Sequence, residues 1–538
     1  MAITRATWRV CTRLAAAGIT LGALVAAAPA VSAGTVSAQV TAGSVSSGAG
    51  GPVVRTANGA VRGLASGAVD EFLGIPYAAP PVGALRWQPP QPAASWSGVR
   101  AATQFAPHCP QVAGPFGEAS TSEDCLYLNV FTPAGGGLHP VMVWIHGGAL
   151  VSGESNDYDP AGLVADGVTV VTINYRLGAL GFLAPPALAG ANGQSGDYGL
   201  MDQQAALRWV QRNIANFGGD PRNVTIFGES AGGLSVLSQV ASPQARGLFQ
   251  KAIAESGSYN LTQASLASAE TAGEAFATQA GCASQTAACL RSLPVSTILA
   301  DQDASGYTPN INSEVLPTSI GTAFATGNFN RVPIINGTNH DEWRLFVALS
   351  ELEGNPVTAA NYQSMISSTL SVPAAVAAII AAQYPLTAYS SPSVALGAVG
   401  TDAIFACPAL SIDESVSKFV PTFAYEFNDE NAPENFLPPV SFPYGAAHAT
   451  EIQYLMGLPT AAFPGTLTAQ QQQLAATMKG YWTNFAKRGV PGSFGSPFWP
   501  LFNTVTQRMQ SLVPPVPQTE TDFATTHKCA FWTALEAA

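Results

Sequence analysis

The most constraining feature of the sequence is a serine between glycines, at the junction of an apolar run and a helical one. Residues 224–227 form an apolar run typical of a strand buried on both faces, and residues 234–240 have helical spacing. The sequence Gly-Glu-Ser-Ala-Gly at 228–232 joins them. Glycines permit a tight turn, and the helix N-terminus directs its amides and positive dipole end at the serine. Ser230 is therefore predicted to be a nucleophile on a strained elbow.

The rest of the chain alternates strand-like and helical segments. Strands are predicted at 126–131, 141–145, 168–173, 224–227, 332–335 and 422–425, and a hairpin at 53–61. Helices are predicted at 203–217, 234–240 and 374–384. This alternation predicts an α/β protein with a mostly parallel, doubly wound sheet flanked by helices. The less regular segments 260–330 and 345–418 are expected to form helical excursions over one edge of the sheet, with no domain break after residue 53.

A serine hydroxyl needs a base, normally a histidine oriented by a carboxylate. Of the six histidines, His448 follows Ser230 with carboxylates between them, which fits the order serine, acid, histidine. His340 is the alternative base. The remaining four lie beside cysteines or at strand ends, and they are His108, His139, His146 and His527.

A second glycine-containing turn predicts an oxyanion hole. The sequence His-Gly-Gly-Ala at 146–149 follows the strand predicted at 141–145, and its glycines allow backbone N–H groups to face a developing oxyanion. Together with the N–H of Ala231, two separate segments would supply donors. Losing one such donor typically costs about 2.7–4 kcal/mol of transition-state stabilisation. This chemistry requires no metal and no organic cofactor.

The N-terminus is typical of a secretory signal peptide. Three arginines precede an apolar run from residue 14 to about residue 30, and small residues follow up to Gly34. The run is interrupted by two glycines and a proline, and it is shorter than the roughly 20 residues that span a bilayer. We expect a signal peptide at 1–33, a flexible Gly/Ser/Ala-rich lead-in at 34–52, secretion, and no stable membrane insertion.

Removal of the signal peptide changes both the charge and the cysteine count. The net charge of −12 becomes −15 when three arginines are lost, which argues against a nucleic-acid partner. The odd count of seven cysteines becomes six when Cys11 is lost. An even number in an exported chain predicts three disulfides.

Several further segments resemble those of the type B carboxylesterases, the α/β-hydrolase family that also contains cholinesterases and some lipases. They are FLGIPYA at 72–78, PPVG at 80–83, EDCLYLNV at 123–130, NYR at 174–176 and NFGGDP at 216–221. The resemblance covers nearly the whole mature chain. It implies one α/β-hydrolase domain over residues 53–538, with helical excursions over the active site.

The resemblance assigns roles to individual residues. It implies that Ser230 is the nucleophile, that His448 is the base, and that Glu342 is the acid, with the neighbouring Asp341 as the alternative acid. It implies oxyanion donors at Gly148, Ala149 and Ala231, supported by Gly147 and Ser256. It also implies the disulfide pairs Cys109–Cys125, Cys282–Cys289 and Cys407–Cys529.

The sequence departs from the family pattern at two places. Trp343 stands where a glycine often follows the acid, so the local turn is expected to differ. The loop between Cys109 and Cys125 contains no tryptophan, whereas cholinesterases carry on this loop a tryptophan that binds the choline cation. The second departure argues against a cholinesterase.

The interpretation is a secreted serine carboxylesterase that hydrolyses a small-molecule ester through an acyl-enzyme. A lipase or polyester hydrolase of the same fold is the alternative within enzymes. A non-catalytic adhesion or binding protein is the alternative outside enzymes. The acyl pocket is expected to come from segments 260–330 and 345–418, which carry no substrate pattern, and no pattern specifies an oligomeric state.

Overall fold

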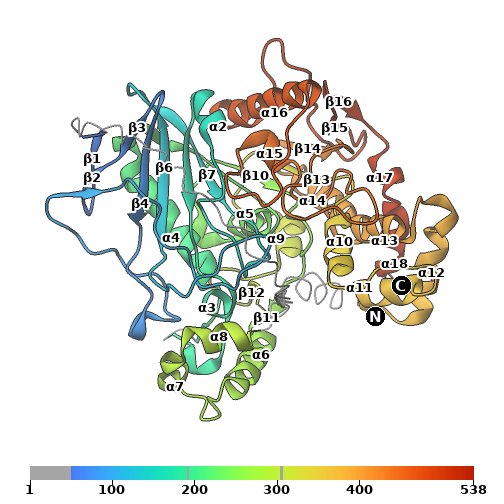
Figure 1. The fold of residues 1–538 in the computed structure, drawn as a ribbon, viewed down its shortest axis with the longest axis horizontal. Coiled ribbons are helices and arrows are strands. Elements are labelled where there is room, and N and C mark those ends of the chain that lie inside the picture. Colours follow the sequence, from blue (N-terminus) through green and yellow to red (C-terminus); the bar gives the residue numbers. More distant parts are fainter. Residues whose placement is uncertain (1–49, 191–192, 303–306, 538) are drawn as a thin grey trace, which may run out of the picture.

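The structure, a computed structural model, describes residues 50–190, 193–302 and 307–537 (Figure 1). The expected signal peptide and most of the expected lead-in lie outside these residues. An 11-stranded sheet runs through the described part of the chain. From edge to edge its strands are β16 (Gln518–Glu520), β15 (Met509–Leu512), β14 (Thr422–Phe427), β13 (Ile334–Asn339), β10 (Lys251–Glu255), β9 (Gly219–Glu229), β7 (His139–Ile145), β8 (Thr169–Ile173), β6 (Tyr127–Pro133), β4 (Val69–Pro76) and β3 (Leu64–Ser66).

The central strands from β15 to β8 are parallel, and the strands at both edges are antiparallel. The mostly parallel α/β sheet predicted from the alternating pattern is therefore confirmed. The carboxyl ends of β7, β9, β10 and β13 meet at one edge, because Ile145 is in register with Gly228 and Glu255 with both Glu229 and Gly337. Ligands of open α/β sheets bind at this edge.

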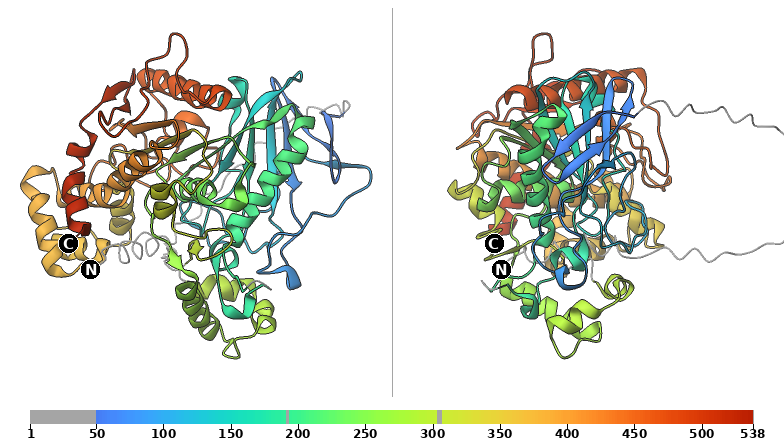
Figure 2. Two further views of the ribbon diagram at one scale, coloured as in Figure 1. Left: turned by 180° about the vertical axis from the view of Figure 1, so that it is seen from behind. Right: turned by 90° about the vertical axis from the view of Figure 1, so that its left-hand side faces the viewer.

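Helices cover both faces of the sheet because side chains alternate along its buried strands. Val143 packs with α4 (Tyr198–Asn213), α5 (Ala231–Ala241) and α9 (Ile320–Thr326) on one face. Trp144 packs with α2 (Ala161–Ala165), α15 (Ile452–Leu455) and α16 (Ala469–Arg488) on the other. Figure 2 shows α4, in green, crossing the sheet when the molecule is seen from behind.

The N-terminal hairpin is also present. β1 (Val53–Thr56) and β2 (Gly59–Arg62) pair antiparallel, and β5 (Val99–Ala101) completes a small three-stranded sheet. A further pair of short strands is β11 (Ala264–Ser265) with β12 (Asn310–Ile311). All three expected disulfides are formed, namely Cys109–Cys125, Cys282–Cys289 and Cys407–Cys529.

The helix expected at 203–217 begins earlier, at Tyr198, and its last turn at Ile214–Phe217 is a 3-10 helix. A distant contact sets the early start. Asp197 is held in the left-handed region (φ 57°), where its carboxylate accepts hydrogen bonds from the Asn310 N–H and the Ser313 hydroxyl. Such a contact across more than 100 residues leaves no local pattern in the sequence.

The irregular segments 260–330 and 345–418 are helical, as expected. They form two separate groups rather than one cover over a single edge, at the bottom and at the right of Figure 1. The first group is α6 (Leu266–Gln279), α7 (Ala287–Ser292) and α8 (Val295–Asp301). The second is α10 (Arg344–Leu352), α11 (Tyr362–Leu370), α12 (Ala374–Gln383) and α13 (Pro392–Gly400), from which the chain continues through a π-helix (Thr401–Ala406) into α14 (Cys407–Val416). The C-terminal helices are α17 (Phe523–Thr526) and α18 (Cys529–Ala537).

Two apolar helical stretches in the second group meet the length and composition of a membrane span. One is the continuous run Pro392–Val416, whose apolar window is 72% buried inside the protein. The other is the pair Tyr362–Leu370 and Ala374–Ala388, which is bent by 112°. The second stretch contains the helix predicted at 374–384. Burial of the longer run identifies it as a core helix of this group.

Candidate active site

Ser230 lies at the junction of β9 and α5, at the carboxyl edge of the sheet. Its backbone is held at φ 56° and ψ −121°, a region that non-glycine residues rarely adopt. The turn requires glycine on both sides: a Cβ at Gly228 would lie 2.4 Å from the carbonyl oxygen of Ile145, and one at Gly232 only 1.9 Å from it. The local sequence therefore forms the expected elbow.

His448 and Glu342 come together from two other loops. Nδ1 of His448 lies 2.5 Å from Oε2 of Glu342. The second oxygen, Oε1, accepts hydrogen bonds of 2.7 Å from both the Thr338 hydroxyl and the Asn339 N–H. Glu342 is fully buried, and the two donors on Oε1 set the orientation of its carboxylate and thereby of the imidazole.

The alternative acid has a different set of partners. Asp341 forms an ion pair with Arg344 at 2.8 Å and accepts the N–H of Ala446 at 3.0 Å. It also lies 3.2 Å from Nδ1 of His340, the alternative base. Asp341 therefore supports the turn that carries His448, and His340 is paired away from Glu342.

The other ring nitrogen of His448, Nε2, lies 3.2 Å from Oε1 of Glu229, the residue before the candidate nucleophile. The contact is not aligned as a hydrogen bond, and within the described residues Nε2 has no hydrogen-bond partner. Nε2 is thus available to accept a proton at the elbow. Apo geometry of this kind often tightens only when substrate binds.

Burial and charge act together on this pair. Burial raises the pKa of Glu229 well above its usual value. Burial opposes the imidazolium of His448, but the carboxylates of Glu229 and Glu342 outweigh it and raise the pKa of His448 to about 9. A proton on Glu229 would lower the pKa of His448, because the Glu229 carboxylate is the largest influence that raises it.

Three more glutamates, Glu229, Glu255 and Glu451, are buried near Glu342 and interact with it or with each other electrostatically. The sequence did not indicate them as site residues. Burial raises the pKa of Glu255 to about 8 and that of Glu451 to about 7. Glu451 accepts a 2.6 Å hydrogen bond from Asn339, whose own N–H orients Glu342. The available signal was their position: Glu229 precedes the serine, and Glu451 is three residues after His448.

The expected oxyanion segment follows β7 and lies against the elbow. A Cβ at Gly147 would be 3.2 Å from that of Ser230. Gly148 (φ 97°) and Ala149 (φ 55°) turn the chain sharply, and within the described residues their N–H groups make no hydrogen bond. The N–H of Ala231, at the start of α5, is equally unused. The structure thus brings three free donors to one place.

His146 and Ser256 lie next to the oxyanion segment and the elbow, and neither forms a hydrogen bond to the triad in the described residues. The buried ring of His146 stacks on Tyr175 at 4.4 Å, and burial lowers the pKa of His146 to about 4, so it remains neutral. Ser256 follows β10, next to the elbow, with φ 50°. Its buried hydroxyl has no hydrogen-bond partner in the described part of the chain, so its expected supporting role is not carried by a hydrogen bond to the triad.

A cavity of about 160 Å³ adjoins the oxyanion segment and is acidic. Its lining includes Gly147, Gly148 and the carboxyl groups of Glu118, Glu154, Asp157 and Glu229. Phe116, from the loop between Cys109 and Cys125, contributes an aromatic wall together with Tyr158 and Phe436. The side wall of this cavity is therefore both aromatic and negatively charged.

Two of these carboxyl groups are electrostatically linked. Glu154 is fully buried, and its Oε1 has no hydrogen-bond partner among the described residues. The pKa of Glu154 and that of Asp157 are both raised to about 7, first by burial and then by a neighbouring carboxylate, which is Glu118 for Glu154 and Glu154 for Asp157. Such a pair gains its full charge most readily when a cation is bound nearby.

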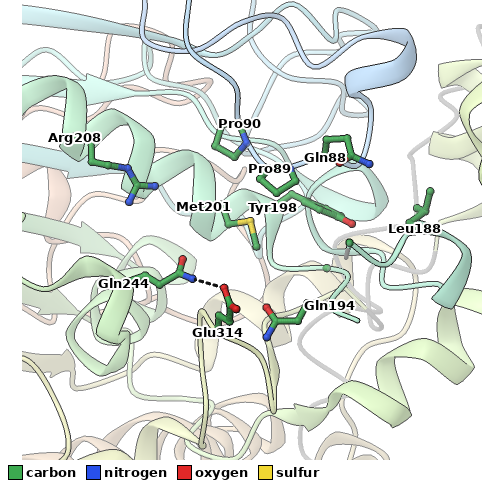
Figure 3. A pocket seen from close by; sticks show the side chains of 12 residues that line it. Gln88, Pro89, Pro90, Leu188, Gln194, Tyr198, Met201, Arg208, Gln244 and Glu314 are labelled. Carbon is green, nitrogen blue, oxygen red and sulfur yellow. Dashed lines mark hydrogen bonds between the residues drawn. The ribbon is translucent and has the colours of Figure 1, made fainter. Parts of the chain in front are cut away.

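A larger cavity of about 240 Å³ lies elsewhere (Figure 3). Tyr198, Met201 and Arg208 of α4 form one wall, and Gln244, hydrogen-bonded to Glu314 at 3.2 Å, lies opposite. None of the candidate catalytic residues lines it. Of these two cavities, the acidic one adjoins the elbow.

Comparison with known proteins agrees with this geometry. The model of the Carboxylesterase family matches residues 50–532. This chain belongs to the carboxylesterase family. As a carboxylesterase it is a carboxylic ester hydrolase, and its sheet is that of an α/β-hydrolase.

Curated relatives of this carboxylesterase are similar over most of both chains. It is 35% identical to the acylcarnitine hydrolase of Mus musculus, over 86% of this chain and 88% of that protein. It is 36% identical to the cocaine esterase of Homo sapiens, over 88% of each. It is 35% identical to the fumonisin B1 esterase of Sphingopyxis macrogoltabida, over 84% of each.

Proposed function

We propose that this carboxylesterase cleaves its ester with a triad of Ser230, His448 and Glu342. The short contact between His448 Nδ1 and Glu342 Oε2 carries the proposal, because it fixes the proton on Nδ1 and leaves Nε2 as the base. Ser230 attacks the ester carbonyl while Nε2 takes its proton, and Glu342 stabilises the resulting imidazolium.

The oxyanion of the tetrahedral intermediate rests on the N–H groups of Gly148, Ala149 and Ala231, whose lack of other partners supports this role. The intermediate collapses when Nε2 returns the proton to the departing alcohol, which leaves an acyl-enzyme on Ser230. A water molecule then attacks with His448 as base again, and the acid is released.

The test is replacement of the nucleophile and of the base. Ser230→Ala and His448→Gln should fold normally and lose nearly all turnover of a short-chain aryl ester. Ser230→Ala should not react with a fluorophosphonate at all, and His448→Gln should react far more slowly than the wild type, because its serine has lost the base. Full turnover by Ser230→Ala, or loss in His340→Gln without loss in His448→Gln, would contradict the assignment. A jump in rate above the solubility limit of a long-chain ester would instead identify a lipase.

We further propose that the substrate carries a cationic group next to the scissile ester. The acidic cavity supports this, since Gly148 of the oxyanion segment lines it together with Glu154, Asp157 and Glu229. Aromatic faces such as that of Phe116 add cation–π attraction. Neutral esters of the same shape would gain neither contribution.

A matched substrate pair tests the cationic preference. A choline ester and its 3,3-dimethylbutyl isostere differ only in charge, so the ratio of their kcat/KM values cancels effects on the triad. The ratio should exceed about 10, rise between pH 6 and 8 as Glu154 and Asp157 ionise, and fall in Glu154→Gln. A ratio near one that does not change with pH would refute the cationic preference.

We also propose that the protein is secreted, with a signal peptide at 1–33, a lead-in at 34–52 and a single hydrolase domain at 53–538. The three disulfides support a location in an oxidising compartment. N-terminal sequencing of the exported protein should give a start near Gly34. An intact Met1 on the exported protein would contradict cleavage.

A further inference from the structure

A cluster of metal-binding residue types lies beside the active site but takes no part in the proposed triad. His340 follows β13, Glu426 lies in β14, and His527 follows α17. One potential ligand atom of each lies within 4.8 Å of the others. Three chain segments that are far apart in sequence therefore converge on one point.

The surroundings of both imidazoles match those of metal ligands. Nδ1 of His527 lies 2.5 Å from Oδ1 of Asp402, and Nδ1 of His340 lies 3.2 Å from Oδ1 of Asp341. Metal-binding histidines nearly always donate their second ring N–H to such a partner, which fixes the tautomer and orients the ring. In His340 this leaves Nε2 as the ligand atom, and in His527 a metal ion would replace the proton that lies between Nε2 and Glu426.

The carboxylate side of the cluster is also held in place. Oε2 of Glu426 accepts a 2.9 Å hydrogen bond from Asn428, and Oε1 faces Nε2 of His527 at 2.5 Å. Asn428 also reaches Oε2 of Glu520 at 3.3 Å. This amide therefore holds the Glu426 carboxylate in a fixed orientation.

When both imidazoles are neutral, the cluster has a net charge of −2, which one divalent cation would balance. Asp341, Asp402 and Glu426 then contribute three negative charges, and Arg344, which pairs with Asp341, contributes one positive charge. The remaining two negative charges lie in a buried region, where uncompensated charge is costly. A divalent ion would neutralise them, as would two protons on the imidazoles.

The geometry needs only small adjustments. Tetrahedral zinc with bonds of about 2.0 Å spaces its ligand atoms about 3.3 Å apart. The contact between Glu426 and His527 would open by less than about 1 Å, and the other separations, at most 4.8 Å, would close. The His340 side chain is 30% exposed, which provides a path for the ion.

We propose that His340, Glu426 and His527 form a zinc site that ties the C-terminal segment to the loop of the candidate acid. Two imidazoles and a carboxylate suit Zn²⁺, whereas Mg²⁺ and Ca²⁺ favour oxygen ligands alone. The proposed site is structural and not catalytic. His340 is two residues from Glu342, but in the described residues no hydrogen bond or ion pair joins His340 to Ser230 or to His448. The sequence predicts no metal, because the three residues are far apart in it and share no motif.

The experiment uses the full chain without an affinity tag, stripped with a chelator and then titrated with Zn²⁺ at pH 7.5. Calorimetry should show one equivalent bound with micromolar or tighter affinity. Co²⁺ in place of Zn²⁺ should give the visible absorption bands of a tetrahedral site, and these should disappear when Zn²⁺ is added in excess.

Variants locate the site. His340→Ala, at a half-exposed position, should weaken binding at least about tenfold. His139→Ala is the matched control, since His139 is a partly buried histidine at the start of β7, away from the cluster, and it should bind like the wild type. Absence of uptake by the wild type, or equal binding by wild type and His340→Ala, would overturn the proposal and leave protons as the counter-charge. Equal weakening by both variants would also overturn it.

Discussion

Replacing Glu342 by Gln tests the proposed acid most directly, because the structure predicts the direction in which the amide will face. The carboxylate accepts from three donors: Nδ1 of His448, the Thr338 hydroxyl and the Asn339 N–H. Glutamine has one acceptor oxygen and one NH₂ group. The backbone N–H of Asn339 is fixed, so the amide oxygen should face it and the NH₂ should face His448.

An NH₂ group facing Nδ1 favours the tautomer that carries its proton on Nε2. That tautomer cannot accept the proton of Ser230, and the imidazolium also loses its counter-charge. Tautomer reversal in a triad lowers kcat by about 10⁴-fold in a well-studied protease. We expect a fall of about 10³- to 10⁴-fold, which is about 4–5.5 kcal/mol at 1.36 kcal/mol per tenfold.

The assay is hydrolysis of a short-chain p-nitrophenyl ester at saturating substrate, with circular dichroism to confirm folding. Asp341→Asn is the control, because Asp341 contacts Arg344 and Ala446 but not His448. Its kcat should stay within about tenfold of the wild type, with a lower unfolding temperature. If Glu342→Gln keeps more than a tenth of the activity, or Asp341→Asn is the more damaging change, the reasoning is wrong.

Three further predictions concern the buried charges and the turn. Glu229→Gln removes the carboxylate that lies 3.2 Å from His448, so the pKa of His448 should fall. The acid limb of the plot of kcat/KM against pH should therefore move to lower pH by about one unit or more. An acid limb at the wild-type pH would contradict this prediction. The pKa of Glu255 is raised to about 8 in the folded protein, so the free energy of unfolding should decrease as pH rises from about 4.5 to 8. Glu255→Gln should remove this contribution, which is up to about 1.4 kcal/mol per pH unit and can be measured by urea denaturation. Parallel pH dependences in the two proteins would refute it. Gly232→Ala places a Cβ 1.9 Å from a carbonyl oxygen and should prevent soluble expression, whereas Gly480→Ala, in helix α16 with no atom within 4 Å, should stabilise by about 1 kcal/mol. Normal expression of Gly232→Ala would show that the elbow is less constrained than its geometry indicates.

Local chemistry accounts for the parts of the site that the sequence predicted well. The elbow depends on Gly228 and Gly232, which act within four residues of Ser230, and the buried strands on each side are recognisable from their apolar runs. The oxyanion turn at Gly148 is equally local. Patterns of this kind are visible because backbone conformation and burial act on neighbouring residues.

Contacts between distant segments account for what the sequence did not predict. The carboxyl groups of Glu154 and Asp157 line a cavity together with Phe116 and Phe436, which come from other parts of the chain. The early start of α4 depends on hydrogen bonds from Asn310 and Ser313 to Asp197. No spacing rule connects such residues.

By itself, the sequence determined the family, the alternating α/β architecture, the serine elbow and the cysteines available for pairing. These follow from composition, periodicity and motifs that operate over short stretches of chain. Only the tertiary structure decided that Glu342 rather than Asp341 faces His448, that Glu229 also lies beside this histidine, and that His340 and His527 share one cluster. The physical reason is that charge interactions depend on distance and burial, which folding sets between residues hundreds of positions apart.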